Sequence, residues 1–145
     1  MFFKRHIFNS SEKKQIVAAI AAAEMKTSGE IRVHVEPQCK GDVLARAAEV
    51  FSKLEMHKTD KRNGVLIYLA HEDKRFAIIG DKGINDVVPA DFWDTTKNEM
   101  SKYFKQGKFE TGVIHGINEA AKHLAIYFPH GSDDKNELSN EISEG

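Results

Sequence analysis

Apolar residues recur close to every 3.6 residues at Ile16, Val17, Ile20 and Ala23, as they do on one face of a helix. Asn9 precedes Glu12 at the spacing of a capping box, and Ser10 and Ser11 are alternative caps. Gly29 supplies a residue type that commonly ends helices. The pattern therefore predicts a first helix between Asn9 and Gly29.

The segments that follow have the patterns of strands and of one more helix. Residues 31–36 alternate apolar and polar side chains, which predicts a strand. Residues 42–54 carry an apolar stripe behind Asp42, a good N-cap, and predict a second helix. Residues 65–70 form a nearly unbroken apolar run, typical of a central strand covered on both faces. Residues 75–79 follow after a short polar turn, so we expect them to return antiparallel as a hairpin.

The second half of the chain predicts two more helices, one starting near Asp91 and one ending at Pro129. Helices placed between and after strands predict an α/β fold, a three-layer α/β/α sandwich around a small mixed sheet. The first two strands are expected to be parallel, joined by a crossover helix. We expect one domain over residues 1–130. Residues 131–145 are acidic with few apolar side chains, which predicts a flexible or loosely docked tail.

Composition narrows the functional classes. A net charge of −1 argues against a general nucleic-acid binder, which normally carries a basic surplus. No stretch approaches the roughly 20 apolar residues that a membrane helix needs, so membrane insertion is not expected. Cys39 is the single cysteine, which excludes an intramolecular disulfide and a cysteine-rich zinc site. The N-terminus has no signal-peptide pattern, so we expect a cytoplasmic protein. We also expect a monomer, because no apolar stripe is left over after the core is assigned.

An acidic segment follows the last predicted strand, and it is the strongest candidate for a functional site. Carboxylates crowded into one loop repel each other unless water or a cation separates them, and an oxygen-only ligand set suits Ca²⁺ or Mg²⁺. The predicted hairpin brings this loop to the same sheet edge as residues 57–64 and the start of the first strand. The candidate ligands are Asp81, Asp86, Asp91 and Asp94, with Glu30, Asp60 and Asn85 as further members.

A purely structural explanation of this loop remains open. Asp91 or Asp94 would then cap a helix, and Asp81 and Asp86 would occupy turns. The segment lacks the acidic alternation and central glycine of an EF-hand. The seven histidines form no His-x-His or His-Glu-x-x-His motif, so a histidine-bound transition metal is not expected. No motif identifies a nucleophile or a general acid, so the catalytic residues, if there are any, are unknown.

Three short segments, in their order and spacing, resemble the TPM domain family. They are Ser-Gly-Glu-Ile-Arg-Val at 28–33, Asn-Gly-Val-Leu-Ile-Tyr at 63–68, and Gly-Asp-Lys-Gly-Ile at 80–84. Lys74-Arg75 and the Phe109-x-x-Gly112 pattern fit the family as well. The resemblance covers roughly residues 11–128. The last of the three segments differs from the family's commoner Gly-x-Gly loop.

The resemblance implies an α/β/α sandwich with a divalent-cation site where two loops cross. Some members of the family are described as acid phosphatases, and many are tethered to membranes or fused to other domains. We therefore expect a stand-alone member that binds Ca²⁺ or Mg²⁺, with the metal linking loops 57–64 and 80–94 and modulating activity or partner binding. The alternatives are a metal-dependent phosphomonoesterase and an interaction module that presents its acidic tail to an unidentified protein partner.

Overall fold

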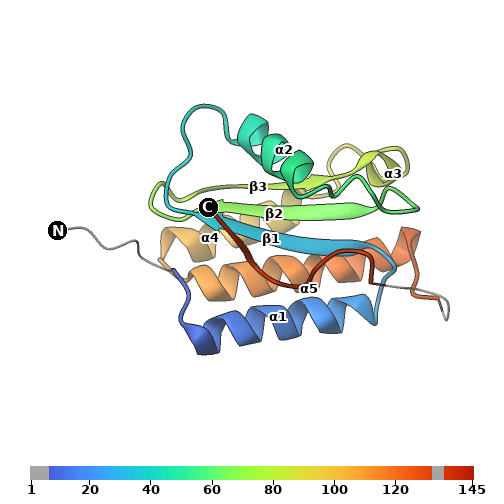
Figure 1. The fold of residues 1–145 in the computed structure, drawn as a ribbon, viewed down its shortest axis with the longest axis horizontal. Coiled ribbons are helices and arrows are strands. Elements are labelled where there is room, and N and C mark those ends of the chain that lie inside the picture. The colour runs from blue at the N-terminus through green and yellow to red at the C-terminus, as the bar shows by residue number, and fades with distance from the viewer. Residues whose placement is uncertain (1–6, 132–135) are drawn as a thin grey trace.

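The computed structural model describes residues 7–131 and 136–145, which form a layered α/β structure (Figure 1). The elements are α1 (Ser10–Glu24), β1 (Glu30–Glu36), α2 (Val43–Lys53), β2 (Gly64–Ala70), β3 (Arg75–Gly80), α3 (Lys82–Asn85), α4 (Asp94–Lys105), α5 (Phe109–Tyr127) and β4 (Ser143–Glu144). In Figure 1, α2 lies over one face of the sheet and α1, α4 and α5 lie over the other, while α3 follows the end of β3. The predicted three-layer sandwich is confirmed.

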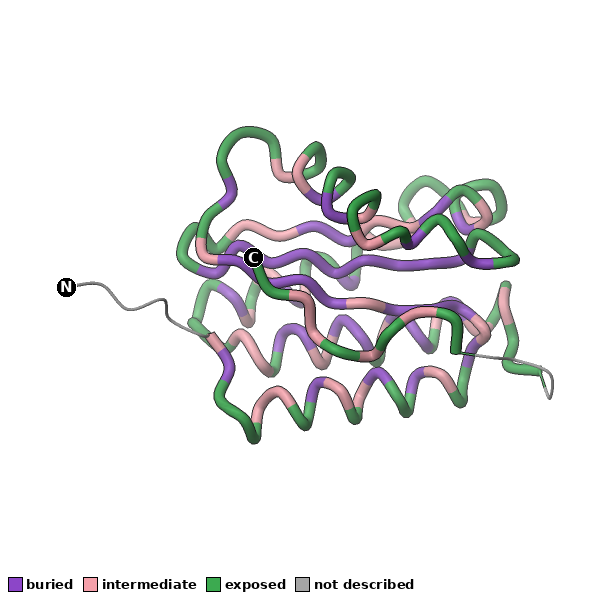
Figure 2. The backbone as a smooth tube through the Cα atoms, viewed as in Figure 1, coloured by how far each residue is buried: buried purple, intermediate pink, exposed green. Residues whose placement is uncertain are grey.

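The four strands lie in the order β3-β2-β1-β4. β1 is parallel to β2 and to β4, whereas β2 and β3 form an antiparallel hairpin. All seven residues of β2 are buried (Figure 2), because the strand is central and covered on both faces. Its alternate side chains enter two cores: Ile67 packs toward α1, α4 and α5, and Tyr68 packs toward α2. The predicted parallel crossover and the hairpin are both present.

The helix starts follow the sequence signals closely. Asn9 accepts the backbone N–H of Glu12 at 2.8 Å while the Glu12 side chain accepts that of Asn9 at 2.9 Å, which completes a capping box. The Asp42 side chain caps α2 at Ala45. α4 begins at Asp94, three residues later than the predicted start near Asp91.

The last ten residues, predicted to be flexible or loosely docked, are docked on the sheet. They lie along the outer edge of β1, and Ser143–Glu144 pair with it as β4. Leu138 packs against the core on the α2 side of the sheet, and Ile142 packs against the core on the other side. Two apolar anchors four residues apart are enough to hold a short acidic segment on the sheet edge. Residues 132–135, which also belong to the predicted tail, lie outside the described residues.

Candidate metal centre

One edge of the sheet gathers the starts of β1 and β2 and the end of β3. The Glu30 N–H donates to the carbonyl of Asn63, and the Asn63 side chain donates to the carbonyl of Ser28. The backbone N–H of Asp81 donates to the carbonyl of Gly64. The segments that carry the predicted ligands Glu30, Asp60 and Asp81 therefore meet at one edge of the sheet.

Asp81 is already neutralised by a protein cation at this edge. Its two carboxylate oxygens accept hydrogen bonds from Nε and Nη2 of Arg62 at 2.7 and 2.8 Å. It also caps α3 by accepting the N–H of Lys82. Burial acts to raise the pKa of Asp81, but the Arg62 guanidinium and the Lys82 N–H outweigh it and lower that pKa. The charge that a dication would balance is here balanced by Arg62.

The other members of the aspartate loop are exposed and do not converge. Asp86 forms an ion pair with Lys82 at 2.6 Å, and the Asn85 side chain donates to the carbonyl of Gly80. Asp94 lies in the first turn of α4, and the Asp91 carbonyl accepts its N–H. No three of the predicted carboxylate ligands bring their ligand atoms within 4.8 Å of one another in the described part of the chain. The metal-ligand set drawn from this loop stays a prediction.

Glu30 is the predicted ligand with the environment most like a metal site. Its side chain is buried, and Oε1 accepts the backbone N–H groups of Glu137 and Leu138 at 2.7 and 2.6 Å. Oε2 is buried and has no hydrogen-bond partner among the described residues. Buried polar atoms are rarely left unpaired, so this oxygen is expected to meet a proton, a water molecule or a ligand.

A cavity of about 140 Å³ lies beside Glu30. Two further buried oxygens that lack a hydrogen-bond partner belong to its lining residues: Oε1 of Glu24 and Oγ of Ser28. The lining residues are Glu24, Met25, Thr27, Ser28, Gly29, Glu30, His130 and Asn136. Three residues that line this cavity therefore each carry one buried oxygen without a partner among the described residues, and oxygen is the ligand type that a hard cation accepts.

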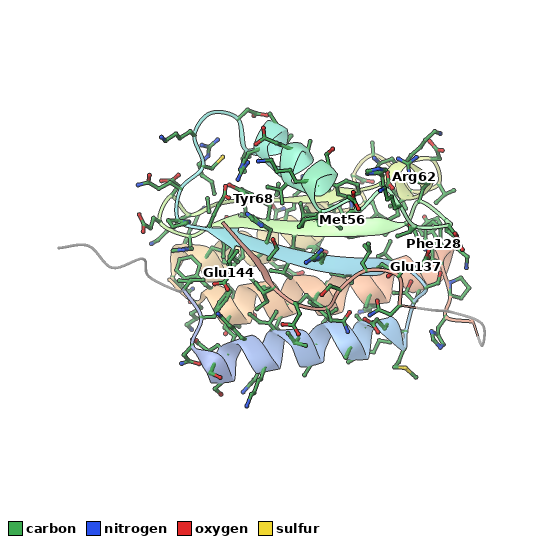
Figure 3. The ribbon with its side chains drawn as sticks, viewed as in Figure 1. Met56, Arg62, Tyr68, Phe128, Glu137 and Glu144 are labelled. Carbon is green, nitrogen blue, oxygen red and sulfur yellow. The ribbon has the colours of Figure 1, made fainter. Side chains whose placement is uncertain are left out.

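Glu137 is a site residue that the sequence reasoning missed. Its carboxylate accepts the backbone N–H of Asp60, with Oε2 at 3.3 Å, and its own N–H donates to Glu30. Figure 3 shows Glu137 at the same end of the molecule as Arg62 and Phe128. The structure therefore brings Glu30 and Asp60 together through the C-terminal segment. The apolar residues Leu138 and Ile142 are the sequence signal that this segment docks.

The pKa of Glu30 is raised to about 7, chiefly because its side chain is buried. The N–H groups of Leu138 and Glu137 act in the opposite direction, and the nearby Glu137 carboxylate adds to the rise because it is a like charge. At neutral pH, Glu30 therefore exchanges readily between a protonated state and a charged state that calls for a counterion.

The metal-free protein is expected to lose stability as pH rises because of Glu30. The pKa of Glu30 is about 7 in the folded protein and 4.5 in the unfolded chain. The stability that the protonated Glu30 side chain contributes is therefore fully present below about pH 4.5 and is lost as the pH rises through 7. The difference corresponds to about 3 kcal/mol. Glu30→Gln keeps the shape without ionising, so urea unfolding between pH 5 and 8.5 in chelator should show a flatter profile for this variant. Parallel profiles for the two proteins would contradict the assignment.

Glu36, a second buried carboxylate, has a contrasting environment. Arg46 donates to both of its oxygens at 2.8 and 2.9 Å, the Tyr68 hydroxyl donates to Oε2, and His34 Nε2 lies 2.9 Å from Oε1. His34 Nδ1 in turn lies 2.9 Å from the hydroxyl of Ser143 in β4. Burial acts to raise the pKa of Glu36, but these partners outweigh it and lower the pKa to about 2. Both oxygens of Glu36 thus have partners within the protein, whereas Oε2 of Glu30 has none among the described residues.

Within residues 7–131 and 136–145, one group of three metal-ligating side chains has all its ligand atoms within 4.8 Å of one another: Glu99, His115 and Glu119. None of them belongs to the predicted site. No helix in the same two ranges combines the length and apolar character needed to cross a membrane.

Comparison with known proteins identifies a matching family and similar solved structures. The model of the TPM domain matches residues 2–123. The NMR structure of the BA42 protein from the psychrophilic bacterium Bizionia argentinensis shares 53% identity over the whole of both chains, with a TM-score of 0.93. Among curated proteins, the comparison finds no match.

Two more distant solved structures share the fold. An N-terminal domain from P. gingivalis has a TM-score of 0.72 at 13% identity, covering 86% of this chain and 82% of its own. The N-terminal domain of the cg2496 protein from Corynebacterium glutamicum has a TM-score of 0.63 at 15% identity, covering 95% of this chain and 81% of its own.

Proposed function

Starting from the fact that the chain belongs to the TPM domain family, we propose that it is a binding domain for a hard dication, Ca²⁺ or Mg²⁺. The ion would bind at the edge of the sheet where β1 begins, with Glu30 as the central ligand. Glu137 donates its backbone N–H to Glu30 and accepts that of Asp60 with its carboxylate, so as a second ligand it would join the sheet, the loop after α2 and the C-terminal segment.

The unpaired Oε2 of Glu30 is the observation that carries this proposal. A buried carboxylate with one unpaired oxygen, beside a cavity lined by two more residues that each have an unpaired buried oxygen, offers the ligand type that a hard cation prefers. A dication would replace the proton that Glu30 holds near neutral pH and would offset the repulsion from Glu137. Glu36 has no such need because Arg46 already pairs with it.

Ion binding would act on the docking of the C-terminal segment. Glu30 receives the N–H groups of Glu137 and Leu138, so an ion on Glu30 and Glu137 would fix residues 136–138 to β1. An ion that binds only this arrangement stabilises it by mass action. In this way the ion concentration would set the fraction of molecules in which the segment is docked. It would thereby control how often a partner can reach the outer side of β1.

The test is a titration of chelator-treated protein with Ca²⁺ and with Mg²⁺, followed by amide chemical shifts and by melting temperature. We expect shifts at Glu30, Asp60 and Leu138 and a rise in melting temperature, both lost in Glu30→Gln and Glu137→Gln. Glu141→Gln, an exposed change in the same segment, is the matched control and should behave as wild type.

Two outcomes would overturn this placement. A response that survives Glu30→Gln but disappears in an Asp86→Asn, Asp91→Asn double variant would move the ion to the aspartate loop. No response to either ion at millimolar concentration would remove the proposal altogether. The same samples should be assayed with a generic phosphate ester, because hydrolysis that requires the metal would favour the phosphomonoesterase instead.

A further inference from the structure

A second, chemically different cluster lies on the helical layer at α4 and α5. His115, Glu119 and His123 are spaced by four residues, so they share one face of α5. After α4 and a short turn, α5 runs back along α4, and this brings His115 opposite Glu99. The cluster thus combines imidazole and carboxylate groups from two helices.

The two helices are held close together by glycines in α5. A Cβ atom added at Gly116 would lie 2.6 Å from Sδ of Met100, and one added at Gly112 would lie 2.5 Å from the ring of Phe104. A side chain at either position would force Met100 or Phe104 to move, so the two glycines permit the observed close approach of the helices. The separation between Glu99 and His115 is therefore fixed by the packing of the core beneath them.

The distances within the cluster suit a metal ion. Nε2 of His115 lies 3.1 Å from Oε1 of Glu99, and all three ligand atoms of Glu99, His115 and Glu119 lie within 4.8 Å of one another. Two ligands about 2.1 Å from a tetrahedral ion are themselves about 3.4 Å apart. Nε2 of His123 lies 3.7 Å from Oε1 of Glu119, so a second imidazole adjoins the group. The ring of Tyr103 packs beside the ring of His115, with 5.5 Å between the ring centroids.

We propose that Glu99, His115 and Glu119 form a binding site for a borderline transition-metal ion such as Zn²⁺. Imidazole nitrogen together with carboxylate oxygen favours such ions, whereas the Glu30 cavity presents unpaired oxygens and favours Ca²⁺ or Mg²⁺. Three protein ligands leave at least one coordination position for water or for a small ligand. The ion would tie α4 to α5 on the opposite layer from α2, independently of the site at Glu30.

The experiment is a titration of chelator-treated protein with Zn²⁺ by calorimetry and with Co²⁺ by visible absorption, each in millimolar Mg²⁺. We expect one equivalent of Co²⁺ to develop the d–d bands of a bound ion. His115→Gln and Glu119→Gln should each raise the dissociation constant about tenfold or more. Melting curves without metal check that each variant is folded.

His57→Gln is the matched control, because His57 is an exposed histidine in the loop after α2. It should bind Zn²⁺ as wild type does. Equal losses in His57→Gln and His115→Gln would show scattered binding to surface histidines and overturn the proposal. Unchanged affinity in Glu119→Gln and His115→Gln would overturn it too, leaving ordinary ion pairs between the helices.

Discussion

Replacing Glu36 by leucine is expected to lower the free energy of unfolding by about 3 to 5 kcal/mol, the cost of removing one partner from a buried ion pair. The change leaves Arg46 without its principal counterion and leaves the hydroxyl of Tyr68, a fully buried side chain, without its acceptor. His34 loses its carboxylate partner at the same time. Urea unfolding monitored by circular dichroism measures the difference.

Glu49→Gln is the matched control for this result. Glu49 also pairs with Arg46, but its side chain is 57% exposed, so the loss should stay below about 1 kcal/mol. Similar losses in the two variants would show that burial of Glu36 contributes nothing beyond a surface ion pair, against the network described above.

Gly83→Ala is expected to destabilise the protein by about 4 kcal/mol, because the new methyl group meets backbone and not a movable side chain. A Cβ atom at this position would lie 2.1 Å from the carbonyl oxygen of Lys61 and 2.7 Å from that of Arg62. The loop must therefore separate from α3, which also breaks the hydrogen bond from the Gly83 N–H to Arg62. The estimate exceeds ordinary overpacking, about 1 to 3 kcal/mol, because this bond is lost too.

Gly29→Ala provides the comparison. Its added Cβ meets a methyl group of Leu124 at 3.0 Å, and a side chain can move where a backbone carbonyl cannot. Thermal unfolding should show a much smaller change in melting temperature for Gly29→Ala than for Gly83→Ala. Equal changes would mean that the contact between α3 and the loop before β2 yields as easily as a side chain.

Most of the architecture could be predicted from local sequence patterns. The unbroken apolar run at 65–70 identified the central strand, because a strand covered on both faces has apolar side chains on both and shows no alternation. The capping box at Asn9 and the Asp42 cap fixed two helix starts because both caps act within one turn of the chain. These features depend on neighbours in sequence.

The missed elements depend on neighbours in space. α3 is a single turn, too short for periodicity to appear, and its Gly83 reflects a close approach to residues 61–62 and not a property of the acidic loop. β4 is two residues long and forms on the edge of a strand more than 100 residues earlier. No local pattern in the sequence identifies the partner in either contact, although Leu138 and Ile142 do indicate that the C-terminal segment docks.

The candidate site was predictable only in part, for the same reason. The aspartate loop is conspicuous in the sequence, but Arg62 and Lys82 neutralise two of its charges. Glu30 sits in an ordinary alternating strand, and only the fold shows that one of its oxygens lacks a partner. The cluster on α5 has a readable spacing from His115 to His123, but its fourth member, Glu99, comes from another helix.

The placement of β4 has a consequence for synthesis on the ribosome. β1 is among the first strands to be translated, whereas the residues that pair with its outer side, Ser143–Glu144, come near the end of the sequence. At about 5 to 20 residues per second, roughly 5 to 20 s separate the two events. During that interval the outer N–H and C=O groups of β1 are unpaired and could pair with another chain. Contact with a chaperone or with the ribosome surface would prevent this.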